Sequence, residues 1–355
     1  MPLRTVEKPG FLHLLKKMDP RYQPPSKHAM SRTHIPKLYD VTRQKVMRTL
    51  KTATNFAATT DMWSSHGMTP YMGYSVHFID DDWTLQHIDL GTSFVPQDHT
   101  ADNLKEAMGD MLEQWGLKAS NQVCITTDSG ANVIKAVNDL KWEHLSCFGH
   151  NLHLGITKSY SPTTHPEEHR AVSRSLGIAH QIVSKFNTSW KRKRDLRAAQ
   201  VKSGKDPKSL ISDCVTRWGS TQGMVKRLLD NEQEIRQVIA NDRKISHLLP
   251  TWQDISVLEA INEVMEPLAE LTDIMSGSKY VTISSLKAML KKLEQDVLAP
   301  KTPDDDSNPD DLLSNKLRQN ILDDLLPRYQ SAAKMNILCV TSFLDPRFKV
   351  SYIIT

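Results

Sequence analysis

One stretch of ten residues constrains the fold of this chain more than any other. Residues 123–132 begin as an apolar, β-branched run typical of a strand and stop at Asp128. Ser129 and Gly130 follow as a turn pair, and a helical pattern begins at Ala131. Open α/β sheets bind ligands at the carboxyl edge of such strands. Asp128 is therefore predicted to be either a functional carboxylate or only the cap of the next helix.

A second stretch ends in the same way. Within residues 55–65, apolar residues are again followed by Thr-Thr-Asp, and this aspartate is Asp61. Neighbouring strands lie roughly 4.8 Å apart. Two carboxylates at the ends of adjacent strands would share a site with room for divalent cations. The pair favours a metal-carboxylate site more than either aspartate does alone.

Composition sets the broad class of the protein. A chain of 355 residues with 39% hydrophobic content is long enough for about two globular domains. Runs of roughly 18 apolar residues are absent, so no membrane span is expected, and the first residues lack the apolar core of a signal peptide. Four widely spaced cysteines favour a reducing compartment over a disulfide framework. The formal net charge of +4 decides little by itself.

Residues 55–155 show an α/β pattern. Strands are predicted near residues 55–63, 71–79, 84–94, 123–128 and 145–148, with helices at 103–115 and after Ala131. The order β-β-β-α-β-α-β is that of a ribonuclease-H-like domain, a mixed sheet whose first and fourth strands are neighbours. Asp61 and Asp128 fall on those two strands.

The strand pattern stops after residue 155. Helices are predicted at about residues 167–201, 221–240, 252–275, 282–297 and 311–325. Before the sheet, residues 1–54 are rich in proline and basic side chains and include a helix at 41–50. The predicted fold class is therefore α/β followed by all-α, with an N-terminal strap (1–54), a ribonuclease-H-like core (55–155) and a helical domain (156–355).

Several motifs come in one order at fitting distances. They are residues 60–65, 76–80 with Trp83, 127–132, 147–154, 216–218 and 343–349. Together they resemble the catalytic domain of hAT-superfamily DNA transposases, especially the vertebrate BED-zinc-finger proteins derived from them. The resemblance covers residues 10–349 and implies a ribonuclease-H-like mixed sheet interrupted by a large helical insertion.

The resemblance also implies roles for four residues. The family's catalytic triad is Asp, Asp, Glu, and by motif Asp61 and Asp128 are its first two members. They would hold Mg²⁺ or Mn²⁺ for cleavage and transfer of DNA strands. The family's Cys-x-x-His motif corresponds to Cys147 and His150, and is thought to shape the active site and position the DNA.

Two parts of the family pattern are not found in this sequence. The triad glutamate is expected beyond the helical insertion, in a dimerisation segment after Thr355, and no BED finger with a Cys-x-x-Cys and a later His pair occurs. We therefore expect the chain to be a middle piece of a longer protein, which would form a homodimer through the missing segment. Whether the protein is still an enzyme is left open.

The spacing of Cys147, His150 and His153 also suggests zinc. A structural zinc site needs four ligands, usually in two pairs, and no second pair has matching spacing. The sequence favours a packed helix start at His150, and no zinc is expected within this chain.

Two features point to DNA. Trp218, after Arg217, resembles the family's tryptophan that stacks on DNA, although a core position is the alternative. The second feature is a basic stretch that begins at Trp190 and is predicted to bind phosphates or to act as a nuclear-localisation patch; a solvated helix face is the alternative. Its basic residues are Lys191, Arg192, Lys193, Arg194, Arg197, Lys202, Lys205 and Lys208.

We therefore expect a nuclear, transposase-derived protein that binds DNA, of the BED-finger regulator kind, with a vestigial or incomplete metal site and no membrane contact. The main alternative is an active transposase that depends on Mg²⁺. A third alternative is a protein-interaction module whose helical half binds partners.

Overall fold

The computed structural model describes residues 2–214, 218–277, 280–301 and 309–349. The chain forms two compact units. The first holds residues 1–125 and 135–143, and the second holds residues 126–134 and 144–355. Within the described residues, no helix is long and apolar enough to cross a bilayer.

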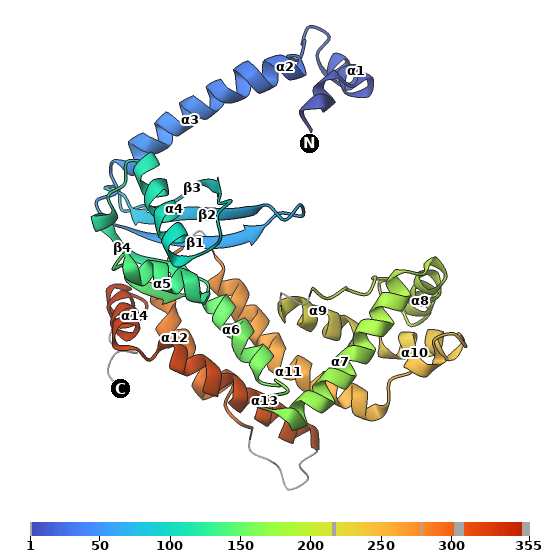
Figure 1. The fold of residues 1–355 in the computed structure, drawn as a ribbon. Helices are drawn as coiled ribbons and strands as arrows, with labels where there is room; N and C mark the ends of the chain where they lie inside the picture. Colours follow the sequence, from blue (N-terminus) through green and yellow to red (C-terminus); the bar gives the residue numbers. More distant parts are fainter. Residues whose placement is uncertain (1, 215–217, 278–279, 302–308, 350–355) are drawn as a thin grey trace. The chain divides into compact units, whose positions relative to one another are not determined.

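Five strands form one mixed sheet (Figure 1). They are β1 (Phe56–Ser64), β2 (Pro70–Ile79), β3 (Leu85–Phe94), β4 (Gln122–Thr127) and β5 (His144–Ser146). The order across the sheet is β3-β2-β1-β4-β5, and the first three strands are antiparallel. Helix α4 (Ala101–Gln114) follows β3, and α5 (Ala131–Asp139) follows β4. The predicted order of elements and the adjacency of the first and fourth strands are confirmed.

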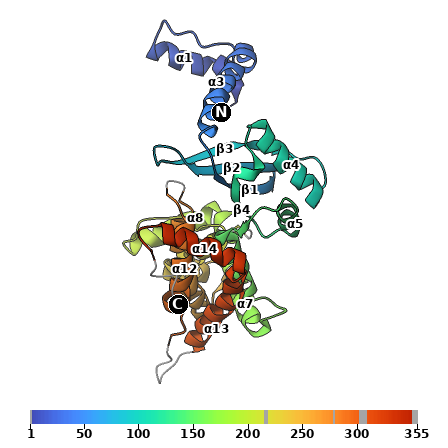
Figure 2. The same cartoon turned by 90° about the vertical axis from the view of Figure 1, so that its left-hand side faces the viewer.

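Alternation of side chains places the core of the first unit on one face of the antiparallel strands. Met72, Tyr74, Val76 and Phe78 of β2 are buried, whereas the residues between them are half-buried. The period of two is what a sheet with one covered face requires. The Tyr74 hydroxyl donates a 2.7 Å hydrogen bond to Oε1 of Gln122, and burial raises the Tyr74 pKa. Figure 2 shows the three strands side by side from a second direction.

The N-terminal residues are helical. The elements are η1 (Leu3–Glu7), α1 (Pro9–Met18), α2 (Lys27–Ala29), η2 (Met30–His34) and α3 (Ile35–Leu50). Helix α3 starts at residue 35, before the predicted residue 41. It directly continues the helical elements that span residues 27–34. The Arg43 guanidinium lies 5.4 Å from the Trp115 ring centroid and donates a 2.7 Å hydrogen bond to the Gln114 carbonyl. These contacts hold α3 against the end of α4.

The second unit is helical. Its helices are α6 (Phe148–Lys158), α7 (Pro166–Asn187), α8 (Trp190–Lys202), α9 (Trp218–Leu229), α10 (Glu232–Ala240), α11 (Trp252–Met275), α12 (Ile283–Lys292), α13 (Pro309–Leu325) and α14 (Ala332–Leu344). Short helical turns are η3 (Ala119–Asn121) in the first unit, and η4 (Ser246–Leu248), η5 (Leu293–Val297) and η6 (Leu326–Tyr329) in the second. Helix α11 contacts α7, α9 and α13, and it buries Leu258, Ile261 and Leu268. It is the centre of this unit.

Two predicted helices are each divided in two. The helix predicted at 167–201 breaks before Ser189, whose hydroxyl accepts from the Arg192 amide and starts α8. The helix predicted at 221–240 breaks before Asn231, whose side-chain amide donates to the Arg227 carbonyl. Ser and Asn side chains compete with helical backbone bonds, which explains both breaks. The prediction at 252–275 is confirmed by α11, whereas α14 was not predicted.

The compact units do not divide at the predicted residue 155. The division passes through the end of β4 and the middle of α5, and residues from His144 onward group with the helices. The reason is packing, since α6 lies against α13 and α11. Residues that precede the predicted border therefore share a core with the helical unit.

Candidate functional site

Asp128 lies directly after β4, where the strand-to-helix turn was predicted. Its Oδ1 atom accepts a 3.1 Å hydrogen bond from the Gly130 amide, and the Gly130 carbonyl accepts from the amide of Ile134 in α5. A Cβ atom at position 130 would lie 3.1 Å from Oδ1 of Asp128. A glycine at this position therefore lets the carboxylate fold back onto its own turn, just ahead of the helix.

A buried polar network holds this turn. The Ser129 hydroxyl donates a 3.0 Å hydrogen bond to Oδ1 of Asn151 in α6. Nδ2 of Asn151 donates a 3.0 Å bond to the hydroxyl of Tyr329 in η6. Asn151 and Tyr329 are almost fully buried, and burial raises the Tyr329 pKa. Because buried polar groups are costly without partners, the network fixes the turn that carries Asp128.

His144 lies on the strand beside that turn. The Thr127 hydroxyl donates a 2.7 Å bond to the Asp128 carbonyl and lies 2.9 Å from Nε2 of His144. Since that hydroxyl has one hydrogen, His144 donates to it from Nε2. Burial lowers the His144 pKa, as does the charge of Lys334, whereas Asp128 raises it. The imidazole is therefore held in its neutral form close to the Asp128 turn.

Asp61 lies on β1, opposite Gly73 of β2. Its side chain is exposed, and Oδ1 accepts a 2.9 Å hydrogen bond from the Met62 amide. The Trp63 ring lies over Gly73, where a Cβ atom would be 2.8 Å from it. Trp63 also stacks on Tyr71, with ring centroids 6.2 Å apart. Asp61 therefore has an exposed aromatic side chain beside it.

The two aspartates belong to different compact units, Asp61 to the first and Asp128 to the second. The strands that lead to them are neighbours in the sheet. Their convergence on a shared cation stays a prediction. Among the described residues, no group of three or more His, Cys, Asp or Glu side chains could hold a metal ion.

Cys147 and His150 lie at the start of α6. The Cys147 amide donates a 2.8 Å bond to the Thr127 carbonyl, and the helix begins one residue later at Phe148. His150 is half-buried, with its ring centroid 6.5 Å from that of His153. Burial lowers the His153 pKa, and so does the neighbouring His150. The packed helix start that the sequence favoured is present, and it lies beside the Asp128 strand.

Of the residues expected to bind DNA, Arg217 lies outside the described residues. Trp218 is only 7% exposed at the start of α9, which favours the core position over base stacking.

Residues 190–202 of the basic stretch form helix α8, which packs against α7 and α10. Arg192 pairs with Asp242 at 2.9 Å, and Lys205, beyond the helix, pairs with the buried Glu234 at 2.9 Å. These two cations stabilise the fold. Lys193, Arg197 and Lys208 are exposed and form no ion pair with the part of the chain that is described. Only part of the predicted basic surface is therefore open to a phosphate.

A five-stranded mixed sheet joined to a helical region, with Asp61 on one strand and Asp128 just after the neighbouring strand, defines the ribonuclease-H-like class of fold. Comparison with protein families narrows this class. Residues 59–153 match the ZBED1 RNase-like domain, and residues 145–264 match the ZBED1 RNase-like helical domain. The chain belongs to the transposase-derived hAT and BED-finger proteins.

Individual relatives agree with this assignment. The chain is 25% identical to the human "Zinc finger BED domain-containing protein 4", with 99% of this chain and 29% of that protein aligned. It is 24% identical to a "Putative AC transposase" of Zea mays, over 79% of this chain and 36% of that protein. It is 22% identical to a "Putative transcriptional regulator tpeD" of Talaromyces stipitatus, over 82% and 38%. The chain thus spans about a third of the length of these three relatives.

Proposed function

We propose that this chain is part of a nuclear protein that associates with DNA and regulates transcription, and that its transposase active site is vestigial. The observation that carries the proposal is the exposed face of α8. Lys193 and Arg197 lie there beside the exposed Trp190, and neither cation has an ion-pair partner among the described side chains. Unpaired cations on one helix face are suited to phosphates, whose neutralisation dominates affinity for DNA.

The relatives support the proposal at the level of their names. They include BED zinc finger proteins and a transcriptional regulator. In the whole protein, a zinc finger would supply sequence specificity, and α8 would add contacts to phosphates that do not depend on sequence. A homodimer formed through another segment is part of the same proposal.

An active transposase is the second candidate. It is favoured by the positions of Asp61, on β1, and Asp128, directly after the neighbouring strand β4, which match the first two members of the family triad by motif. Both aspartates would then hold Mg²⁺ or Mn²⁺, and the third carboxylate would come from elsewhere in the protein. A protein-interaction module made by the helical unit is the third candidate.

The experiment that separates these candidates uses a fluorescein-labelled duplex of arbitrary sequence. Binding is followed by anisotropy at low salt, and the same mixtures with Mg²⁺ or Mn²⁺ are then run on a denaturing gel. We expect binding and an intact duplex. Strand cleavage that Asp128→Asn abolishes would establish the transposase. Failure to bind the duplex at low salt would overturn the DNA-binding proposal and leave the interaction module.

A further inference from the structure

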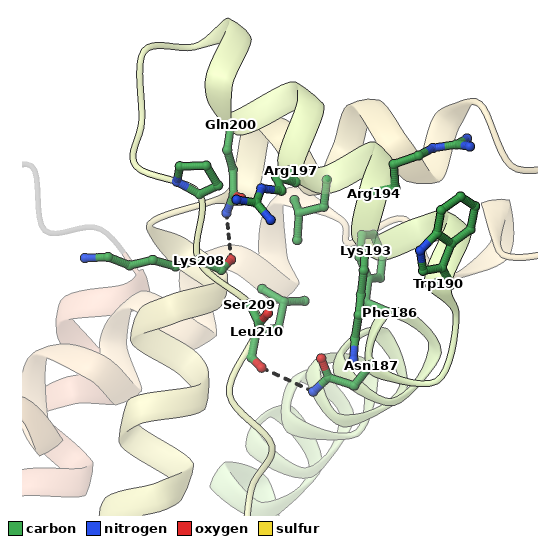
Figure 3. Close-up of a pocket in the computed structure, with 12 residues that line it drawn as sticks. Phe186, Asn187, Trp190, Lys193, Arg194, Arg197, Gln200, Lys208, Ser209 and Leu210 are labelled. Carbon is green, nitrogen blue, oxygen red and sulfur yellow. Dashed lines mark hydrogen bonds between the residues drawn. The ribbon is translucent and has the colours of Figure 1, made fainter. Parts of the chain in front are cut away.

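A cavity of about 400 Å³ lies between α8 and the segment 207–210 (Figure 3). Helix α8 contributes Trp190, Lys193, Arg194 and Arg197 to its lining. The spacing of these residues, three or four apart, puts them on one face of the helix. Counting Lys208 of the facing segment, four cationic residues line the cavity, and none of the described residues around it is a carboxylate.

The opposite face of α8 is different. A second cavity of about 320 Å³ lies there against α10, and Asp195 and Asp242 line it together with three cations. One of those cations, Arg192, already pairs with Asp242. Two carboxylates therefore offset part of the positive charge of α8 on the α10 side, whereas no carboxylate lines the cavity on the side of Trp190.

The open cavity is built on a fixed frame. Nε2 of Gln200, which is 1% exposed, donates a 2.9 Å bond to the Lys208 carbonyl and a 2.8 Å bond to Oδ1 of Asn231. Nδ2 of Asn187 donates a 3.2 Å bond to the Leu210 carbonyl. These bonds tie the 207–210 segment to α7 and α8, so both walls of the cavity are held without a ligand (Figure 3).

Trp190 gives the cavity an aromatic surface. The indole is 75% exposed, and the Arg194 guanidinium lies 5.0 Å from its ring centroid. Arg194 also pairs with Asp195, which holds the guanidinium in place. In Figure 3, Trp190 and Arg194 lie together at one end of the cavity, Arg197 lies nearer the other end, and the Lys208 side chain points away. Arg197 is seven positions after Trp190 in the helix, which is about 10 Å along the axis.

We propose that this cavity binds an unpaired nucleotide within a single nucleic-acid strand. The base stacks on Trp190, and Lys193 and Arg197 hold the flanking phosphates. Aromatic stacking beside a cationic groove is how proteins hold single strands without sequence preference. A duplex hides the faces of its bases and would use only the cations. The inference rests on the proposed association with DNA and names the form of nucleic acid that this helix takes.

The test compares two labelled single strands of about 15 nucleotides, a length near the upper end of common site sizes. One is oligothymidine, and the other is an abasic strand with the same phosphates. Anisotropy titrations use the whole chain at low salt. Trp190→Ala should weaken binding of oligothymidine about 5-fold to 150-fold, since stacking is lost. It should leave binding of the abasic strand unchanged, and Trp190→Phe should keep most of the affinity for oligothymidine.

Trp252→Ala is the matched control, because Trp252 is 70% exposed in the same unit and does not line the cavity. It should bind both strands as the wild type does. Equal losses on both strands for Trp190→Ala, or no loss on either, would overturn the inference even if duplex binding is intact. Thymidine monophosphate should compete poorly. Competition as strong as that of the oligonucleotide would show a mononucleotide site and also overturn it.

Discussion

Nδ2 of Asn151 donates a 3.0 Å hydrogen bond to the hydroxyl of Tyr329, a residue 178 positions later in the chain. Asn151 also accepts from Ser129, which follows Asp128. The buried Asn151 amide thus connects the turn of the candidate site to η6, which follows α13 in the helical unit. Through this bond, the helical unit stabilises the geometry of the strand end.

Replacing Asn151 tests that connection. Asn151→Leu keeps the branched shape of the side chain but leaves the Tyr329 and Ser129 hydroxyls without this partner, and a buried unsatisfied group costs about 1–3 kcal/mol. We expect urea unfolding to show a loss in that range. Tyr329→Phe should cost less, because it removes the hydroxyl and keeps the ring. If the double variant loses the sum of the two single losses, the bond does not couple these residues.

His144 gives a prediction about pH. Its pKa in the folded protein is lowered from 6.5, chiefly by burial and then by Lys334. The folded state therefore binds fewer protons than the unfolded state, so this contribution to stability is complete above pH 6.5 and is lost as pH falls below it. His144→Gln, which cannot titrate, should flatten the fall in melting temperature between about pH 7 and about pH 5. An unchanged profile would show that His144 is not perturbed.

Trp218 is expected to act in the core. Trp218→Ala should lower the free energy of unfolding by about 3–5 kcal/mol, the usual cost of truncating a buried aromatic side chain. Trp218→Phe should lie between this variant and the wild type. A Trp218→Ala protein of normal stability that binds single strands poorly would contradict the buried position and restore the stacking role implied by the family.

The metal prediction depends on whether the two aspartates converge. Mn²⁺ should bind weakly, since two carboxylates leave most of the coordination to water. Isothermal calorimetry compares the wild type with the double variant Asp61→Asn and Asp128→Asn. The wild type should release heat that the double variant does not. Equal heats in both proteins would remove the shared site.

The sheet could be predicted from the sequence, because the period-two alternation of its strands and the stop of one strand at Asp128 are local patterns. Helix α11 could also be predicted from the sequence, and Thr251 and Asp254 form a capping box at its start. The sequence prediction missed the breaks at Ser189 and Asn231, where side chains compete with the backbone. The burial of Trp218 and the neutralisation of Arg192 by Asp242 depend on tertiary contacts, which periodicity does not report.

The need for tertiary contacts also explains why the sequence alone did not separate the paired from the open cations of the basic stretch. In the sequence, Lys191 and Lys193 look equivalent, yet they line different faces of α8. Charge spacing predicted a phosphate-binding helix but could not show which cations are already paired. In the sequence, Trp190 is only an aromatic residue within a charged run. The cavity that it lines forms because the 207–210 segment folds beside α8.

The central claim is that the open face of α8 binds the phosphates of DNA. Duplex binding measured by anisotropy at several salt concentrations tests it most directly. The double variant Lys193→Ala and Arg197→Ala should lower the slope of log affinity against log salt by about 0.9 for each phosphate that the protein no longer neutralises. The control, Lys191→Ala with Lys202→Ala, removes the same charge from the α10 side and should keep the wild-type slope. Equal slopes for the two double variants, or a wild-type protein that does not bind at low salt, would contradict the claim.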